Sequence, residues 1–108
     1  MTDKLKAKYI PMTETAYYIL LALQEPLHGY GIILKVEGLT EGRIRLGAGT
    51  IYGTLSKLEE DGLITVVREE DRRKVYLQTD LGSELLIIEI ERLAQLLRHG
   101  EMWRKLYE

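Results

Sequence analysis

The stretch that decides the fold runs Arg45-Leu-Gly-Ala-Gly-Thr-Ile-Tyr-Gly-Thr-Leu-Ser-Lys-Leu-Glu-Glu-Asp-Gly-Leu-Ile64. At about 100° per residue, Ile51, Leu55 and Leu58 fall within one apolar arc, which predicts a helix with a buried side. The opposite side carries Gly49 and Gly53, although each interior glycine costs a helix about 1 kcal/mol relative to alanine. A helix that packs closely into a DNA groove would gain from a side without bulky side chains. A plain buried core helix would explain the apolar arc equally well, but not the glycines.

Negative charge on this predicted helix is confined to one end. Glu59, Glu60 and Asp61 all stand in the last turn, where they oppose the helix dipole. Only the first half of the helix is therefore suited to approach a phosphate backbone. Gly62 is expected to end the helix before a strand-like run begins.

The composition limits the possible functions. The 108 residues suit one domain with at most one added element, and 15 Lys and Arg against 17 Asp and Glu give a net charge of −2. Any DNA binding must therefore come from local placement of basic groups. The absence of cysteine excludes a disulfide scaffold and a thiolate metal site. No apolar run reaches the roughly 18 residues that span a bilayer, so a soluble, cytoplasmic protein without membrane contact is expected.

The first part of the chain predicts an arm and two helices. Residues 1–12 are expected to form an N-terminal arm. Its first eight residues are expected to be a frayed, solvated tail, with a phosphate contact by Lys4, Lys6 and Lys8 as the less favoured alternative. Thr13 is a good N-cap for a core helix that ends near Gln24, before Pro26. A second helix is expected over residues 30–39, and residues 43–46 are expected to form a short strand.

His28 precedes this second helix, at an end where backbone N–H groups favour anions. A lone histidine at a turn is more often a structural hydrogen bonder, which is the favoured interpretation here. A phosphate contact ranks second, and a metal ligand ranks third because His99 is the only other histidine.

Residues 63–69 and 72–78 predict the two strands of a hairpin, since β-branched residues recur there in runs of suitable length. The hairpin is expected to turn at Glu70 and Asp71 and to have a weakly positive tip. The order of helix, helix, short strand, helix and hairpin is that of a winged helix-turn-helix. We therefore predict a mainly α fold with a small β-hairpin (α+β), whose DNA-binding domain spans residues 13–79.

A final helix is expected over residues 81–99, capped by Thr79 and interrupted by Gly100. Its apolar residues form two arcs, whereas the surface helix of a monomer needs only one, so the second arc requires a partner. Residues 80–108 are therefore expected to form the C-terminal dimerisation helix of a homodimer. The residues assigned to this interface are Leu86, Ile87, Ile90, Leu93, Ala94, Leu97, Met102, Trp103 and Leu106.

Five motifs in register make the chain recognisable. They are His28-Gly-Tyr-Gly-Ile32, Gly49-Thr-Ile-Tyr52, Leu58-Glu-Glu-Asp-Gly-Leu-Ile64, Arg72-Arg-Lys-Val-Tyr76 and Thr79-Asp-Leu-Gly82. Their order resembles that of PadR-like transcriptional regulators of the subfamily with a short, single C-terminal helix. The resemblance runs from about Thr13 to the end of the chain and implies a homodimeric winged-helix repressor. The chain departs from many relatives in its short wing and in Gly53, where a larger side chain often stands.

The expected function is sequence-specific binding of double-stranded DNA by a homodimeric transcriptional repressor at a pseudo-palindromic operator. Two recognition helices would enter successive major grooves about 34 Å apart. The residues expected to contact DNA are His28, Tyr30, Gly49, Thr50, Tyr52, Gly53, Thr54, Lys57, Arg72, Arg73 and Lys74.

Two other functions remain open. One is a sensor that binds a small aromatic effector at the dimer interface, with Trp103 and Tyr107 as its candidate contacts. The other is a protein-binding adaptor that uses the hairpin and the third helix. An enzyme is not expected, because the two histidines lie in separate segments and neither a Ser-His-Asp set nor a phosphate-binding glycine loop is recognisable. No cofactor or metal is expected either.

Overall fold

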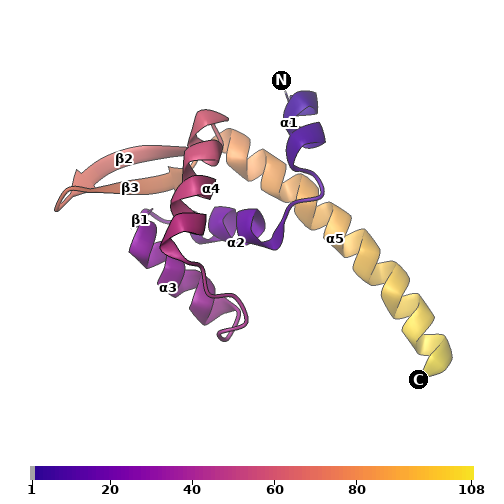
Figure 1. The fold of residues 1–108 in the computed structure, drawn as a ribbon. Helices are drawn as coiled ribbons and strands as arrows, with labels where there is room; N and C mark the ends of the chain where they lie inside the picture. The colour runs from indigo at the N-terminus through magenta and orange to yellow at the C-terminus, as the bar shows by residue number, and fades with distance from the viewer. Residues whose placement is uncertain (1) are drawn as a thin grey trace.

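The computed structural model describes residues 2–108 and places a helical body between a projecting hairpin and a long C-terminal helix (Figure 1). The helices are α1 (Thr2–Tyr9), α2 (Glu14–Ala22), α3 (Gly29–Leu39), α4 (Ala48–Glu60) and α5 (Asp80–Tyr107). The strands are β1 (Leu27–His28), β2 (Ile64–Glu70) and β3 (Arg73–Gln78). This arrangement confirms the predicted winged helix-turn-helix fold. Over the described residues, every helix is too short or too polar to cross a bilayer.

The core is built from the apolar side of each helix. Thr13 caps α2 by accepting a hydrogen bond from the Ala16 N–H at 3.1 Å, as its position predicts. Gly62 has a φ of 78° and directly follows the last turn of α4, also as predicted. Each large apolar side chain that is fully buried contributes about 1.5–3 kcal/mol. These side chains are Ile19, Leu20, Leu23, Ile32, Val36, Ile51, Leu55, Leu58, Leu63, Ile64 and Leu85.

The sheet has the order β1-β3-β2, with both pairings antiparallel. The prediction of a strand over residues 43–46 is wrong, because this segment is a loop in which the Ile44 N–H donates to the Thr40 hydroxyl at 3.0 Å. The third strand is instead β1, immediately before α3. The prediction failed because Ile44 and Leu46 alternate as they would in a strand, whereas both contact the core from a loop.

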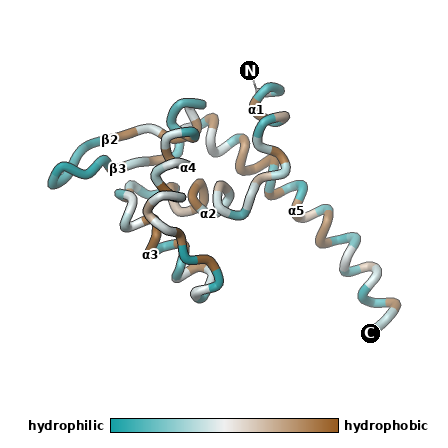
Figure 2. The backbone as a smooth tube through the Cα atoms, viewed as in Figure 1, coloured by the Kyte–Doolittle hydropathy of each residue, from teal (hydrophilic) through white to brown (hydrophobic). Residues whose placement is uncertain are grey.

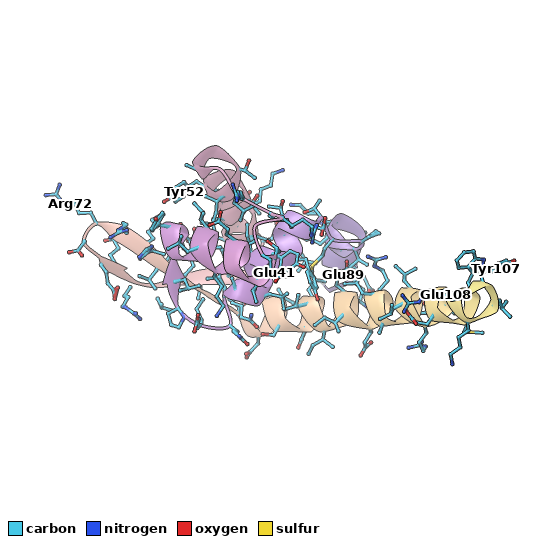
Figure 3. All side chains as sticks on the ribbon, turned by 90° about the horizontal axis from the view of Figure 1, so that it is seen from below. Glu41, Tyr52, Arg72, Glu89, Tyr107 and Glu108 are labelled. Carbon is cyan, nitrogen blue, oxygen red and sulfur yellow. The ribbon has the colours of Figure 1, made fainter. Side chains whose placement is uncertain are left out.

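The hairpin formed by β2 and β3, called the wing below, projects from the body (Figure 1). It turns at Asp71 and Arg72 rather than at Glu70 and Asp71 as predicted, because Glu70 still pairs with Arg73. Both turn residues have positive φ, 49° for Asp71 and 66° for Arg72. A two-residue turn of this kind matches the right-handed twist of the strands, which lets the ladder continue one residue further. Arg72 therefore stands at the end of the wing (Figure 3).

The N-terminal arm is not frayed as predicted, because α1 occupies most of it. Leu5 is buried in the core. The Asp61 carboxylate, just after α4, accepts a hydrogen bond from the Tyr9 hydroxyl at 2.5 Å and pairs with the Lys8 ammonium at 2.7 Å. The contact with Lys8, and then that with Tyr9, lowers the pKa of Asp61, whereas burial and Asp61 raise the pKa of Tyr9. The prediction missed this helix because its anchor lies 52 residues further along the chain.

Helix α5 is continuous from Asp80 to Tyr107, so the predicted interruption at Gly100 is wrong. A single interior glycine costs a helix only about 1 kcal/mol, which the other residues of a 28-residue helix can offset. Residues 93–100 are all exposed, and this half of the helix extends away from the body (Figure 1). Hydrophobic residues nevertheless recur along it (Figure 2).

A buried acid joins α5 to the linker between α1 and α2. Glu89 is only 2% exposed, and the Arg92 guanidinium donates to its two carboxylate oxygens at 2.7 and 2.8 Å. The Met12 backbone N–H donates to the same carboxylate at 3.1 Å. Arg92 and the Met12 N–H hold the pKa of Glu89 below its usual range, against the opposing effect of burial. Nothing in the spacing of Glu89 distinguished it from a surface acid.

Replacing Glu89 with glutamine is expected to destabilise the fold by about 2–3 kcal/mol near neutral pH, because Arg92 and Met12 lose a charged acceptor at a buried position. A lowered folded-state pKa contributes stability above the ordinary glutamate pKa and loses it as the pH falls through the folded value. The advantage of the natural chain over Glu89→Gln should therefore begin to fall as the pH drops below the ordinary glutamate pKa, and should be lost below the folded-state pKa. Urea unfolding followed by circular dichroism across this range measures the effect. Glu91→Gln, an exposed change on the same helix, is the control. A stability difference between the natural chain and Glu89→Gln that does not change with pH would contradict the role given to the Glu89 carboxylate.

Candidate nucleic-acid interface

The outward face of α4 is bare over its first half. Apart from the adjoining residues and backbone of α4 itself, no heavy atom of the described residues lies within 4 Å of the point where a Cβ on Gly49 or Gly53 would stand. Thr50 is exposed, and Tyr52 is 50% exposed at the side of this face. Thr54 is only half-buried, but its hydroxyl donates to the Thr50 carbonyl at 2.9 Å, so the helix itself occupies that donor. The face therefore offers a low surface on which Thr50 and Tyr52 are the available polar side chains.

The outer end of the wing is strongly hydrophilic (Figure 2), and its four basic residues slightly outnumber its three acids. Arg68 lies further in and pairs with Glu70 at 2.8 Å, which lowers the pKa of Glu70. Its charge is therefore largely compensated within the wing. The basic residues of the wing that are exposed and form no ion pair with another described residue are Arg72, Arg73 and Lys74.

A hollow of about 380 Å³ lies between the wing, α4 and the start of α3. Its lining residues are Gly29, Tyr52, Ser56, Glu69, Arg72, Arg73, Lys74 and Tyr76. Of the predicted contact residues, the fold thus brings Tyr52 of α4 and the three basic residues of the wing to the same hollow. The hollow lies at the end of the molecule opposite Tyr107 (Figure 3). Gly29, Ser56, Glu69 and Tyr76 were not predicted as contacts. A signal for Tyr76 was present, because the two-residue period of a strand places it on the same face as Lys74.

The start of α3 borders this hollow, and its polar groups are partly occupied. His28 Nδ1 accepts a hydrogen bond from the Gly31 N–H at 3.2 Å, which is the structural role that its position favours. Tyr30 is exposed in the first turn of α3. Lys57 is exposed but borders a second hollow, of about 310 Å³, with residues of α1 and the linker after it. The structure therefore separates Lys57 from the basic residues of the wing.

A family model described as the transcriptional regulator PadR-like family matches residues 19–87, which is more than half of the chain. The chain belongs to this PadR-like family. The matched residues include α3, α4 and the whole wing, so the match covers the elements that form the candidate interface. Membership places the protein among transcriptional regulators rather than enzymes.

Individual relatives agree with this assignment. Transcriptional regulator YqjI of Escherichia coli strain K12 is 41% identical over 59 residues, which are 55% of this chain and 28% of that longer protein. The chain therefore spans little more than a quarter of this curated relative. The solved PadR-like transcription factor of Bacteroides fragilis is 30% identical, with a TM-score of 0.63 over 86% of this chain and 89% of that chain. A PadR family transcription regulator from Clostridium difficile R20291 shares the fold at 21% identity, with a TM-score of 0.71 over 84% and 98% of the two chains.

Helix α5 of this PadR-like chain leaves a long apolar surface uncovered. Leu86 is buried in the core of the chain itself, so it is not available to a partner as predicted. The other residues predicted for a dimer interface are exposed, and Trp103 stacks on Tyr107 with ring centroids 4.5 Å apart. A groove of about 470 Å³ lies along the same helix but does not include this aromatic pair. Its lining residues are Ala94, Leu97, Arg98, Glu101, Met102 and Lys105.

Proposed function

We propose that this PadR-like regulator is a sequence-specific DNA-binding repressor that acts as a homodimer on a pseudo-palindromic operator. The observation that carries the proposal is the hollow that Tyr52 of α4 shares with the basic residues at the outer end of the wing. Gly49 and Gly53 leave the outward face of the same helix bare. Duplex DNA offers base edges in a groove that is bordered by rows of phosphates. A helix face without bulky side chains is complementary to the groove, and the unpaired basic side chains beside it are complementary to the phosphates.

The proposed contacts divide into two kinds. Thr50 and Tyr52 reach base edges or thymine methyl groups, while Gly49 and Gly53 allow the helix backbone to lie deep in the major groove. Thr54 supports this helix, since its own hydroxyl is engaged by the Thr50 carbonyl. The other proposed contacts hold phosphates and set the register. They are His28, Tyr30, Lys57, Arg72, Arg73 and Lys74.

Helix α5 is the proposed dimer element. Exposed apolar residues recur along α5 to its last turn, among them Ile90, Leu97, Trp103 and Leu106, and so many on one helix are more than the scattered apolar residues of a monomer surface explain. An isologous partner would cover the helix with the same residues, and its two-fold axis would match the symmetry of a pseudo-palindromic operator. Residues 80–108 are thus assigned to dimerisation and residues 13–79 to DNA.

Selection of bound duplexes from a random pool, followed by fluorescence anisotropy with salt titration, tests this function. We expect one enriched sequence with two-fold symmetry, bound far more tightly than a scrambled duplex, and a steep loss of affinity as salt rises. A reporter gene placed behind the selected sequence should be expressed less when the protein is present. Equal, weak binding to all duplexes would contradict sequence-specific binding, and increased expression would contradict repression.

Replacing Leu97 with aspartate is expected to convert the dimer to a monomer, because the side chain is 63% exposed in one chain and would face the partner. A charge in an apolar interface loses its hydration without gaining a counter-ion. Sedimentation equilibrium measures the oligomeric state, and the same variant should bind a full operator with markedly lower affinity. Gln95→Asp places the same charge on the polar side of α5 and should leave a dimer. Equal masses for the two variants would contradict the assigned face.

A second candidate function is response to a planar aromatic effector, which the exposed Trp103–Tyr107 stack favours. A planar ring can extend such a stack in the same geometry. The chain has one tryptophan, so fluorescence quenching reports on this position alone. Saturable quenching that also weakens operator binding would support an effector role, and no response across a broad panel of aromatic acids would remove it.

A further inference from the structure

Gly29, the first residue of α3, is pressed against Tyr52 of α4. A Cβ added to Gly29 would lie 2.7 Å from the Tyr52 hydroxyl oxygen and 2.9 Å from two carbons of its ring. A Cβ atom essentially never lies within 3.0 Å of a non-bonded heavy atom, so the ring occupies the space that any side chain at position 29 would need. Gly29 is itself buried, whereas Tyr52 remains 50% exposed.

Backbone conformation does not explain this glycine. The positive φ angles among the described glycines belong to Gly42 and Gly62, and Gly29 has helical geometry that alanine adopts more readily. Gly38, in the same helix, shows the contrast, because no described heavy atom outside the adjoining residues and backbone of α3 lies within 4 Å of the place where its Cβ would stand. The requirement at position 29 is therefore space for the Tyr52 ring.

The start of α3 is fixed relative to the wing. β1 ends at His28, which pairs with Val75 of β3 while Leu27 pairs with Tyr76. His28 also caps α3 through its contact with the Gly31 N–H. The surface on which the Tyr52 ring rests is thus continuous with the base of the wing, and the ring, α3 and the wing border the same hollow.

From this geometry we infer that Gly29 is a positioning residue for Tyr52. This inference rests on the proposed DNA-binding function and adds detail to it. With no side chain at position 29, the ring lies against α3 before DNA arrives, so its rotamer does not have to be ordered on binding. An alanine at position 29 displaces the flexible end of the Tyr52 side chain from its contact with α3 and leaves the backbone of both helices in place.

The test compares Gly29→Ala with Gly38→Ala by anisotropy on the selected operator. Gly29→Ala should bind about tenfold more weakly, the equivalent of one misplaced base contact, while Gly38→Ala should bind like the natural chain. In a Tyr52→Ala background, adding Gly29→Ala should change affinity less than about twofold, because the contact is already gone. A merely structural loss at position 29 would instead persist in that background. This outcome would overturn the inference, and so would full affinity in the single variant.

A second readout needs no DNA. NMR of ring-labelled tyrosine, with the Tyr52 signal assigned from Tyr52→Phe, should show that signal moved by Gly29→Ala and unmoved by Gly38→Ala. If Gly29→Ala unfolds, the affinities of Tyr52→Ala and Gly29→Ala/Tyr52→Ala can still be compared, because neither variant has a Tyr52 ring for the added methyl group to contact. An unmoved Tyr52 signal with tight operator binding by the natural chain would overturn the positioning role alone. Failure of the natural chain to bind any selected duplex would overturn the DNA-binding function and, with it, this inference.

Discussion

Replacing Gly82 with alanine is expected to destabilise the protein more than any other single methyl addition to its glycines. A Cβ at this position would lie 2.1 Å from the Leu63 backbone carbonyl oxygen and 3.1 Å from its carbon. Unlike the Tyr52 ring beside Gly29, this obstacle is main chain and cannot rotate away. Overpacking typically costs 1–3 kcal/mol, and we expect about 3 kcal/mol or more here because two backbone segments must separate.

The cost is high because several elements meet at Gly82. The Thr79 hydroxyl accepts a hydrogen bond from the Gly82 N–H at 3.1 Å and donates to the Gly62 carbonyl at 2.6 Å. The Thr79 N–H donates to the same Leu63 carbonyl at 3.0 Å. Moving the start of α5 away from Leu63 therefore breaks the cap of α5 and its attachment to the segment that follows α4.

Chemical unfolding at a fixed protein concentration measures this prediction, since a dimer's stability depends on concentration. Gly100→Ala is the matched control, because it adds the same methyl group to the same helix at a point where no described heavy atom beyond the adjoining residues and backbone of α5 lies within 4 Å. That variant should gain up to about 1 kcal/mol from helix propensity. Equal stability changes for the two variants would show that Gly82 does not approach Leu63 as described.

The fold was predictable where the signals were local. Thr13, Gly62 and Thr79 act on residues within four positions of themselves, and each stands at the helix end that the sequence indicates. The apolar period of α4 likewise depends on one helix alone, and Ile51 and Leu55 are buried as it predicts. The third strand was predicted at the wrong place, because its position does not depend on a local signal. A loop that covers the core and a strand have the same alternation, and only β3 decides which segment pairs with it.

The candidate site was predictable only within single elements. The glycine face of α4 and the basic residues of the wing are recognisable as sequence patterns, but the hollow that Tyr52 shares with the wing depends on how α4 packs against the rest of the fold. Gly29 beside Tyr52 and Gly82 beside Leu63 look like ordinary glycines in the sequence. Glu89 looks like a surface acid, because its partner Met12 lies in a distant segment. Each of these depends on a contact between segments far apart in the chain, which periodicity does not encode.

Replacing both Arg72 and Arg73 with alanine is expected to weaken operator binding by roughly a hundredfold at moderate salt, with little change in stability. The two side chains are exposed and form no ion pair within the described chain, so the folded state loses no compensating contact. The matched control is Arg104→Ala/Lys105→Ala. It removes the same charge from the opposite end of the molecule (Figure 3), where Arg104 already pairs with Glu108 at 3.1 Å. This control should bind the operator nearly as the natural chain does.

The salt dependence distinguishes a phosphate contact from a distant charge effect. Each phosphate contact contributes about 0.9 to the slope of log affinity against log salt, so a dimer that loses four such contacts should show a slope shallower by about 3 to 4. The preferred sequence should not change, because phosphates carry no base identity. Anisotropy titrations at several salt concentrations measure both quantities. An unchanged slope and affinity would mean that the wing does not contact DNA, and the hairpin and α4 would then be better explained as a protein-binding surface.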